Sequence, residues 1–491
     1  MRLEGEISLQ AFSAALRDNT LEMPQDVYNR LRAARTVVEA AAAGEAPVYG
    51  LNTGLGANLG HRIAAEDIPA FQRKLIEGRA VAVGPLLDPE VGRALMLARI
   101  VGAAQGHSGM SVSMFDHLCA LWRAGIVPGI PQYGSIGASD LTQNACWAMV
   151  VLGGGQCWDG EEWRRTSDVF VAQGIDVPEL EIKDGMALIN HSGASVALAG
   201  IALEEARAGL AMMQHAAVLS CQGYAANRQI FQYDINALRA APGQEEMAAW
   251  FLNQLSGSRP ARKVQDALSF RTLAPVLGAA AEALGRAISI WQDELNGASD
   301  SPAVIGDQAM CSTSNFHTPA LALALEQVSL ALAMAASGAV MRVQRMMDPD
   351  LSGLARYLSP VGGASAGFVP LQKTAAALLG DIRRHAMPVV LDPPPVSDGV
   401  EDMAPMTPLA AQKLSDQMVP FHLLCGIEAI VAAQACDLRG CPPSALHGAL
   451  RREVPFMNED RPLGDDATRA SRVLRRFQAA TNDSAFNAEG G

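Results

Sequence analysis

The chain has 491 residues, of which 49% are hydrophobic but only 5% aromatic, and its formal net charge is −13. This length allows a large core and more than one structural lobe, and abundant alanine with 20 methionines suits tightly packed helices. The negative charge, together with the lack of any run of clustered Lys and Arg, argues against nucleic acid as a partner.

Cysteine usage and the amino terminus predict a cytoplasmic location. The eight cysteines are scattered, form no Cys-x-x-Cys pair and have no zinc-like spacing, so we expect reduced thiols and no metal site. No apolar signal segment follows Met1, which argues against secretion. The longest apolar stretch, 319–341, contains Glu326 and Gln327 in a helical pattern, so a helix buried among helices fits it better than a membrane span.

In chain order, residues 1–192 are predicted to form a mixed N-terminal domain, with helices over 27–43 and 89–104 and a small hairpin over 150–163. From residue 193 onward, long runs rich in alanine and leucine predict helices at 195–219, 272–292, 318–345, 367–384 and 408–438. Five such runs predict a mainly α protein, with an elongated helical bundle over 193–491. Between the last two runs, three prolines in 389–398 predict an extended passage that leads to Glu401.

A series of short motifs follows in a fixed order along the chain. They are YGLNTG at 49–54, GSIGASDL at 134–141, ALIN at 187–190, QDALSFR at 265–271, ELNGASD at 294–300 and SNFH at 314–317, followed by Glu401 and Asp402. Each motif alone is weak. The ordered series resembles the histidine and aromatic amino acid ammonia-lyases over almost the whole chain.

This resemblance implies a fumarase/aspartase-like helical fold and a homotetramer whose pockets are built from several subunits. It also implies roles for individual residues. Tyr49 matches the base that removes the substrate β-proton, Asn190 faces the substrate carboxylate, and Arg271 pairs with that carboxylate. Phe316 and His191 are further candidates for contact with the substrate.

The most informative departure from the family is a missing glycine. The family has Gly-Ala-Ser-Gly-Asp-Leu, and its Ala-Ser-Gly cyclises into the electrophilic methylidene-imidazolone (MIO) ring, whereas here Ala138 and Ser139 are followed directly by Asp140. Ring closure needs the backbone nitrogen of the third residue to attack the carbonyl of the first in a cramped turn, where a Cβ obstructs the approach. We therefore predict a vestigial MIO site at 138–140 and no cofactor.

Three further positions differ from the family in chemical character. Arg79 stands in place of a histidine, Leu268 in place of a tyrosine, and Lys373 in place of a neutral residue. In this respect the chain resembles the ring-free, ergothionase-type members of the superfamily, which release trimethylamine from ergothioneine, the 2-thiol trimethylbetaine of histidine, and form thiourocanate. The resemblance implies a small betaine substrate whose nitrogen leaves without an electrophilic ring.

On this reading Leu268 forms an apolar wall beside the three methyl groups. An unpaired buried ammonium is costly, so Lys373, the one charge within an apolar run, is expected to pair with Glu401. Lys373, with Arg79, would stabilise charge at the sulfur, and Glu401 would hold or exchange a proton with a ring nitrogen. Two alternatives stay open: Lys373 reaches solvent or a structural ion pair, and Asp140 contacts the trimethylammonium group or only shapes the old ring site.

Two rival functions also remain. One is a histidine or aromatic ammonia-lyase in which residues 138–140 still cyclise, and the other is a catalytically silent homologue that only binds. Retention of Tyr49, Asn190, Arg271 and Glu401 speaks against silence. A second Ala-Ser-Gly triad, at 336–338, lies inside a predicted helix, where hydrogen-bonded backbone cannot fold back to cyclise.

Overall fold

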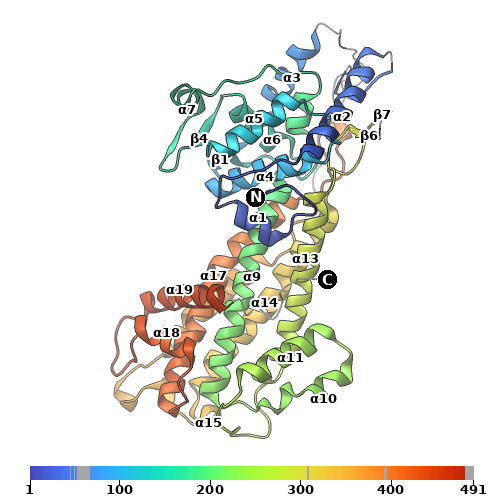
Figure 1. Ribbon diagram of the computed structural model, residues 1–491. Helices are drawn as coiled ribbons and strands as arrows, with labels where there is room; N and C mark the ends of the chain where they lie inside the picture. The colour runs from blue at the N-terminus through green and yellow to red at the C-terminus, as the bar shows by residue number, and fades with distance from the viewer. Residues whose placement is uncertain are drawn as a thin grey trace. The chain divides into compact units, whose positions relative to one another are not determined.

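The computed structural model describes residues 1–44, 46–48, 50, 51, 53, 63, 67–306, 309–391 and 395–481. The protein is mainly helical, with 63% of residues in helices, and the strands are short (Figure 1). The predicted fold class is confirmed.

The chain folds into two compact units, and each unit is discontinuous in sequence. Unit 1 comprises Met1–Ala202, Ile288–Leu323 and Pro388–Gln412, and unit 2 comprises Leu203–Ala287, Ala324–Met387 and Lys413–Gly491. The division expected from the sequence was instead a single boundary between 192 and 193. The segments 288–323 and 388–412, expected in the bundle, contact the N-terminal part of the chain.

Unit 1 combines helices with three small antiparallel sheets, which agrees with the mixed character predicted for the N-terminal region. The sheets have strand orders β1-β3, β2-β4-β5 and β6-β7. The helices are α1 (Leu9–Ala15), α2 (Gln25–Ala43), α3 (Ile68–Glu77), α4 (Pro89–Ala104), α5 (Val112–Arg123), α6 (Leu141–Val151), α7 (Thr166–Gln173) and α8 (Asp184–Ile189). The strands are β1 (Val83–Leu86), β2 (Val127–Pro128), β3 (Pro131–Tyr133), β4 (Gln156–Trp158), β5 (Trp163–Arg165), β6 (Ala303–Ile305) and β7 (Ala309–Cys311).

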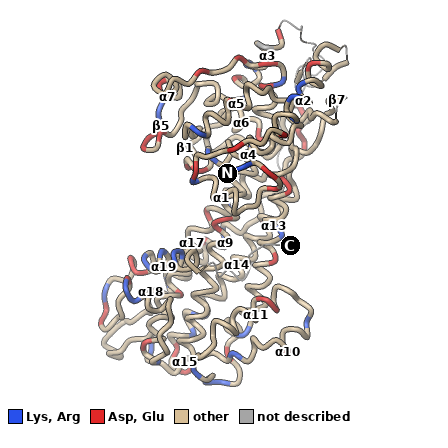
Figure 2. The backbone as a smooth tube through the Cα atoms, in the orientation of Figure 1, with Lys and Arg blue, Asp and Glu red and all other residues tan. Residues whose placement is uncertain are grey.

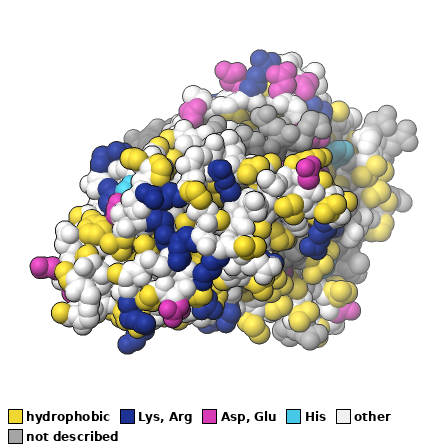
Figure 3. Space-filling model, turned by 90° about the horizontal axis from the view of Figure 1, so that it is seen from below, with side chains coloured by type: hydrophobic (Ala, Val, Ile, Leu, Met, Phe, Trp, Pro, Cys, Tyr) yellow, Lys and Arg dark blue, Asp and Glu magenta, His cyan; other side chains and the backbone are white. Residues whose placement is uncertain are grey.

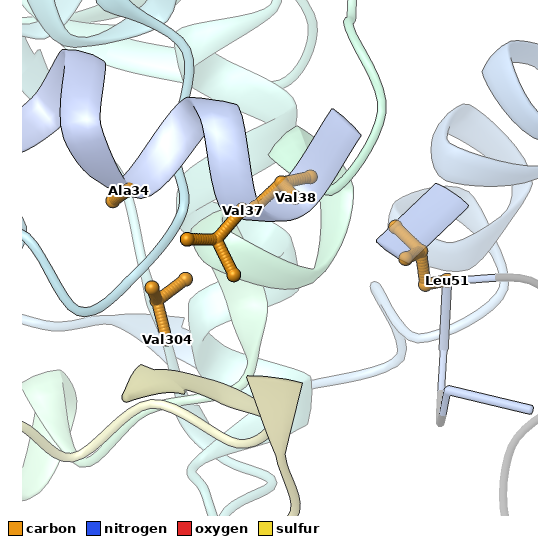
Figure 4. Packing of buried hydrophobic residues seen from close by; sticks show 5 residues of the cluster. All are labelled: Ala34, Val37, Val38, Leu51 and Val304. Atoms are coloured by element: carbon orange, nitrogen blue, oxygen red, sulfur yellow. The ribbon is translucent and has the colours of Figure 1, made fainter. Parts of the chain in front are cut away.

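One core cluster of unit 1 follows directly from helical periodicity. Ala34, Val37 and Val38 are spaced on one face of α2, and they pack with Leu51 and with Val304 of β6 (Figure 4). All five side chains are almost completely buried. The cluster therefore fixes α2 against a strand that lies more than 250 positions later in the sequence.

Four long helices, α9 (Gly193–Tyr224), α13 (Leu273–Asn296), α14 (Pro319–Met346) and α17 (Thr407–Arg439), contribute residues to both units. Together with α16 (Val369–His385) they confirm the five predicted helical runs. The remaining helices of unit 2 are α10 (Tyr233–Asn236), α11 (Pro242–Gln254), α12 (Leu268–Arg271), α15 (Pro349–Ser352), α18 (Ala445–Glu453) and α19 (Gly464–Thr481).

Buried ion pairs connect the long helices of unit 2. The Arg342 guanidinium of α14 donates to both carboxylate oxygens of Glu428 on α17, at 2.6 and 2.9 Å, and the Ser220 hydroxyl of α9 donates to the same carboxylate at 2.7 Å. Glu326 and Lys413 form a second buried pair between α14 and α17. Because each buried charge has a partner, these polar groups can lie inside an otherwise apolar bundle.

Four helical segments are long and apolar enough to cross a membrane by length and composition, namely Asp184–Tyr224, Leu273–Asn296, Pro319–Met346 and Thr407–Arg439. Their most apolar windows are 94%, 56%, 61% and 83% buried within the protein itself. Figure 2 shows that α9 and α14 carry few charges along their length. Packing of helices against one another accounts for most of this apolar surface.

The second Ala-Ser-Gly triad of the sequence is part of a long helix. The triad at 336–338 lies within α14, and the Ser337 hydroxyl donates to the Ala333 carbonyl at 3.1 Å, so this triad is ordinary helix as predicted.

The sequence shows no basic run, but Figure 3 shows Lys and Arg side chains gathered on one face of the molecule. Some basic side chains of unit 2 are engaged with backbone carbonyls, since Arg259 donates to Gly440 and Arg262 to Leu351.

Candidate active site

A cavity of about 620 Å³ lies within unit 1. Four residues predicted for the site line it, namely Arg79, Ala138, Asn190 and Glu401. The other lining residues are Gly78, Val81, Gly134, Ser135, Ile136, Leu141, Thr142, Met186, Val396, Ser397 and Asp398. The cavity therefore brings together the end of α3, the loop before α6, the end of α8 and the turn before α17.

Arg79 is the one basic residue among those that line the cavity. It follows directly after α3, which ends where the Gly78 N–H donates to the Lys74 carbonyl at 2.9 Å. The Arg79 guanidinium donates to the Leu75 carbonyl at 3.3 Å and is only partly buried. Anchored on one side by its own helix, it supplies positive charge to the cavity.

The opposite charge comes from a tight turn over 396–401. The Val396 N–H donates to the Glu401 carbonyl at 3.0 Å and the Glu401 N–H donates back at 3.3 Å, while Ser397 and Asp398 have φ angles of 55° and 54°. This turn places Asp398 and Glu401 on the same cavity. The extended passage predicted over 389–398 is wrong at its end, because 397–399 is a 3-10 turn.

Asp398 is a cavity residue that the sequence analysis missed. The only local signal for it was the Ser-Asp-Gly sequence at 397–399, which is typical of a turn. Turn chemistry alone does not show which side chain reaches a cavity. The two carboxyl groups give this part of the cavity an acidic wall that suits a cationic ligand.

Asn190 ends α8 and lines the cavity, although its side chain is only 5% exposed. Its amide nitrogen donates to the Ser301 carbonyl. This bond fixes the orientation of the amide, so the carboxamide is held in place before any ligand arrives. The predicted contact between Asn190 and a substrate carboxylate stays a prediction.

Ser139 and Asp140 are buried and, unlike Ala138, do not line the cavity. Both have positive φ angles, 65° and 51°. The Asp140 carboxyl group accepts hydrogen bonds from the Ser135 hydroxyl at 2.5 Å, the Ser195 N–H at 2.7 Å and the Ser195 hydroxyl at 3.1 Å. Burial raises the pKa of Asp140, an effect that these hydrogen bonds oppose.

These contacts favour the reading in which Asp140 shapes the loop. A carboxyl group that accepts three internal hydrogen bonds and does not line the cavity joins the loop to α9 rather than contacting a ligand there. The loop does not fit the MIO ring, because its third residue carries a buried side chain where cyclisation needs glycine.

His191 has a structural role within unit 1. The Gly193 N–H donates to its Nδ1 at 3.0 Å, so the ring proton lies on Nε2, which is 3.1 Å from the Leu188 carbonyl. Burial lowers its pKa well below the usual value, and the ring is neutral. Neither His191 nor Phe316 lines the cavity, so their predicted substrate contacts gain no geometric support.

Leu268, Arg271 and Lys373 belong to unit 2. Leu268 is 64% exposed and Arg271 is partly buried at the end of α12. Lys373 lies on the exposed side of α16. The expectation that the Lys373 ammonium is buried is therefore wrong for the single chain, because the neighbouring apolar residues Leu371 and Ala375 turn inward without it.

Tyr49, the predicted base, lies outside the described residues, but part of its surroundings is described. The Thr53 hydroxyl donates to the Val48 carbonyl at 3.2 Å, and the Gln72 amide donates to the Gly50 carbonyl at 3.3 Å. Leu51 and Thr53 are buried. Within the described part of the chain, no group of three or more His, Cys, Asp or Glu side chains forms a metal-binding cluster.

Comparison with known proteins agrees with this architecture. Residues 7–455 match the sequence model of the aromatic amino acid lyase family. The chain is 33% identical over 479 residues to histidine ammonia-lyase from Myxococcus xanthus, with 95% of this chain and 94% of the relative covered.

Solved structures give the same fold. One is ergothionase from Treponema denticola in complex with desmethyl-ergothioneine sulfonic acid, with a TM-score of 0.91, 27% identity, and 97% of this chain and 98% of that chain covered. Another is histidine ammonia-lyase from Trypanosoma cruzi, with a TM-score of 0.89, 27% identity, and 98% and 94% covered. The match along nearly the whole length shows that this chain is an enzyme of the aromatic amino acid lyase family.

Proposed function

We propose that this enzyme is a carbon-nitrogen lyase that works without an MIO ring and eliminates trimethylamine from ergothioneine or a related histidine-derived betaine. The product from ergothioneine would be thiourocanate. The observation that carries the proposal is Asp140, which stands at the third position of the ring-forming triad with a buried, hydrogen-bonded side chain.

The leaving group provides the chemical reason. Ammonia leaves poorly, so a family member that releases ammonia needs an electrophile to activate the amine. A quaternary trimethylammonium group leaves as neutral trimethylamine once the β-proton has been removed. A lyase without the ring is therefore suited to a substrate whose nitrogen already carries three methyl groups.

The charges around the cavity suit such a substrate. Asp398 and Glu401 offer carboxylates, and Arg79 offers a guanidinium on the same cavity. We assign Asp398 to the cationic nitrogen, Glu401 to a proton on a ring nitrogen, and Arg79 to the charge that develops on the ring and its sulfur. Family resemblance adds Tyr49 as the base and Asn190 with Arg271 as carboxylate ligands. Lys373, which departs from the family, is proposed as a second cation because of its charge.

The alternative function is that of a histidine ammonia-lyase. The curated relatives with this name are 32–34% identical to the chain, more than the 27% of the ergothionase structure. Overall identity measures shared fold and ancestry, whereas the chemistry of nitrogen release depends on a few residues. The sequence at 138–140 is the local feature that favours the betaine.

We also propose that the chain forms a homotetramer. Leu330, Met334 and Met341 share one face of α14 at intervals of four and seven residues, and they are 51%, 62% and 36% exposed. Exposed apolar side chains in a stripe are typical of a helix face that another subunit covers. Light scattering coupled to size-exclusion chromatography tests this proposal. We propose a cytoplasmic location as well, and the support for it is the scattered arrangement of the eight free cysteines.

The decisive experiment incubates the purified enzyme separately with ergothioneine, 2-thiohistidine, hercynine and histidine. We expect trimethylamine and a conjugated ultraviolet band from ergothioneine, and no ammonia from 2-thiohistidine or histidine. Hercynine shows whether the ring must carry sulfur. Turnover of histidine without turnover of either betaine would overturn the proposal in favour of the alternative.

A further inference from the structure

The C-terminus of α17 closes with a Schellman motif that contains two cysteines. The Cys441 N–H donates to the Cys436 carbonyl at 2.9 Å, and the Gly440 N–H donates to the Asp437 carbonyl at 3.0 Å. Gly440 has the left-handed φ of +63° that this cap requires. Cys436 and Cys441 occupy the two positions of the motif whose side chains commonly contact one another.

The two thiols also face the same turn of α9. The Cys436 thiol donates to the Leu219 carbonyl at 3.6 Å, and the Cys441 thiol donates to the Gln222 carbonyl at 3.4 Å. The two side chains are close enough for each thiol to shift the pKa of the other. Cys436 is buried, whereas Cys441 is only partly buried, so the pair has an inner and an outer member.

The charges around the pair make the outer thiol the more reactive one. The Cys436 side chain lowers the pKa of Cys441, and Arg439 and Arg259 lower it further, whereas partial burial of Cys441 opposes this shift. The Cys441 side chain and burial both raise the pKa of Cys436. Arg259 is held at this place because its guanidinium donates to the Gly440 carbonyl at 2.6 Å.

One carboxylate, Asp437, lies beside the pair and opposes this effect on Cys441. Its charge is offset by the Arg451 guanidinium at 2.7 Å, and the His447 ring nitrogen lies 2.9 Å from the same carboxylate. A thiolate at Cys441 therefore has cationic neighbours, which is the environment of a reactive rather than a purely structural cysteine.

We propose that Cys436 and Cys441 form a redox-active dithiol that a low-molecular-weight disulfide oxidises to an intramolecular disulfide at the end of α17. The Cys441 thiolate attacks one sulfur of the reagent, forms a mixed disulfide and releases one thiol. Cys436 then loses its proton and attacks the Cys441 sulfur, releasing the second thiol. The protein loses two hydrogens, and the small disulfide gains them as two reduced thiols.

The other cysteines provide internal comparisons. Burial raises the pKa of Cys119 and of Cys221 to about 12 and raises that of Cys425 well above its usual value, so these thiols are poor nucleophiles. Cys311 is exposed in a short strand, and it tests whether exposure alone is sufficient for reaction. A Cys311 thiol without a neighbouring cysteine would stop at the mixed disulfide.

The experiment exploits the position of Arg439 between the two cysteines. The full-length enzyme is equilibrated with oxidised glutathione, its free thiols are alkylated, and the denatured protein is digested with trypsin, which cuts after Arg439. The cysteines then lie on separate peptides, 414–439 and 440–451. We expect these peptides to remain linked until a reductant is added, and the intact protein to lose two hydrogens.

Variants separate the two roles. Cys436→Ala is expected to accumulate a mixed disulfide with glutathione on Cys441, whereas Cys441→Ala should form neither product at position 436. Cys425→Ala is the matched control because Cys425 lies on the same tryptic peptide as Cys436, and it should leave the linkage unchanged. Unlinked 414–439 and 440–451 peptides in the oxidised wild-type enzyme, or a linkage through Cys425, would overturn the proposal without any need for a variant to fold.

Discussion

The carboxyl group of Asp140 accepts the backbone N–H of Ser195 at 2.7 Å and so joins the start of α6 to the first turn of α9. Both residues are buried. Cyclisation at 138–140 would require the Asp140 backbone nitrogen to move onto the Ala138 carbonyl while this side chain stays anchored. The anchor and the Cβ both oppose that movement.

The intact mass of the purified enzyme should equal the mass calculated from its sequence. Formation of the ring expels two water molecules, so a cyclised chain would be lighter by that amount. Mass spectrometry of the denatured protein, with a peptide map over 138–140, measures this directly. Loss of two waters at this tripeptide would refute the ring-free mechanism.

Replacement of Asp140 by alanine should destabilise the protein. The variant leaves the buried Ser195 N–H without its acceptor, which costs about 1–3 kcal/mol in the free energy of unfolding. Urea denaturation followed by circular dichroism measures this change. The control Asp168→Ala removes an exposed carboxylate of α7 and should change the free energy by no more than about 0.5 kcal/mol. Equal stability of the two variants would show that the Asp140 contacts are dispensable.

Glu401 and Asp402 form a matched pair for testing the acidic wall of the cavity. Glu401 lines the cavity, whereas the adjacent Asp402 is exposed and does not line it. If Glu401 exchanges a proton with the substrate ring, Glu401→Gln should lower kcat/KM for ergothioneine by about 10²–10⁴-fold. Asp402→Asn should retain nearly full activity. Similar kinetics for the two variants would remove Glu401 from the mechanism.

Lys373 provides a test of the second cation. Lys373→Met should lower kcat/KM by about 10²–10³-fold if the ammonium stabilises developing negative charge. Because Lys373 is exposed in the single chain, we expect the melting temperature and the oligomeric state to stay unchanged. Arg383→Met removes another exposed cation from the same helix, α16, and serves as the control. Full activity of Lys373→Met would show that Lys373 is a surface residue without a role in catalysis.

Glu294, near the end of α13, should make stability depend on pH. Burial, reinforced by the neighbouring Asp293 charge, raises the pKa of Glu294 from 4.5 to about 7. The folded state therefore keeps this proton over a range in which the unfolded state has released it. As the pH rises from about 4.5 to about 7, the free energy of unfolding should fall by up to roughly 3 kcal/mol through this group.

Glu294→Gln should remove that dependence and be more stable than the wild type above pH 7. Denaturation midpoints of the two proteins between pH 5 and pH 8 provide the measurement. Glu77→Gln, at the exposed end of α3, should follow the wild-type curve. Parallel curves for Glu294→Gln and the wild type would contradict the raised pKa.

The long helices could be predicted from sequence because their signal is local. Apolar periodicity and helix-forming composition are visible within a window of about 18 residues, and the observed bounds of α9 and α17 extend the predicted runs by only a few residues at each end. The membership of 288–323 and 388–412 in unit 1 could not be predicted in this way. It depends on contacts between segments far apart in the chain, as between α2 and β6.

The candidate site was predictable only in part. Arg79, Asn190 and Glu401 were identified through family resemblance and do line one cavity. Asp398 was missed because its position depends on a turn with left-handed backbone angles. The three prolines that precede this turn had predicted an extended segment instead. The burial of Lys373 was overestimated because an apolar run shows that a helix packs, but a single charge in the run need not lie on the packed face.

The threefold passage of the chain through unit 1 has a consequence for biosynthesis. A ribosome that has completed residues 1–202 has made most of this unit, but its two remaining segments end at residues 323 and 412. Val304 of β6, which closes the core against α2, is among the residues still to come. The nascent N-terminal part must therefore wait with apolar surface uncovered while about 200 further residues are translated, the interval in which chaperones protect chains from aggregation.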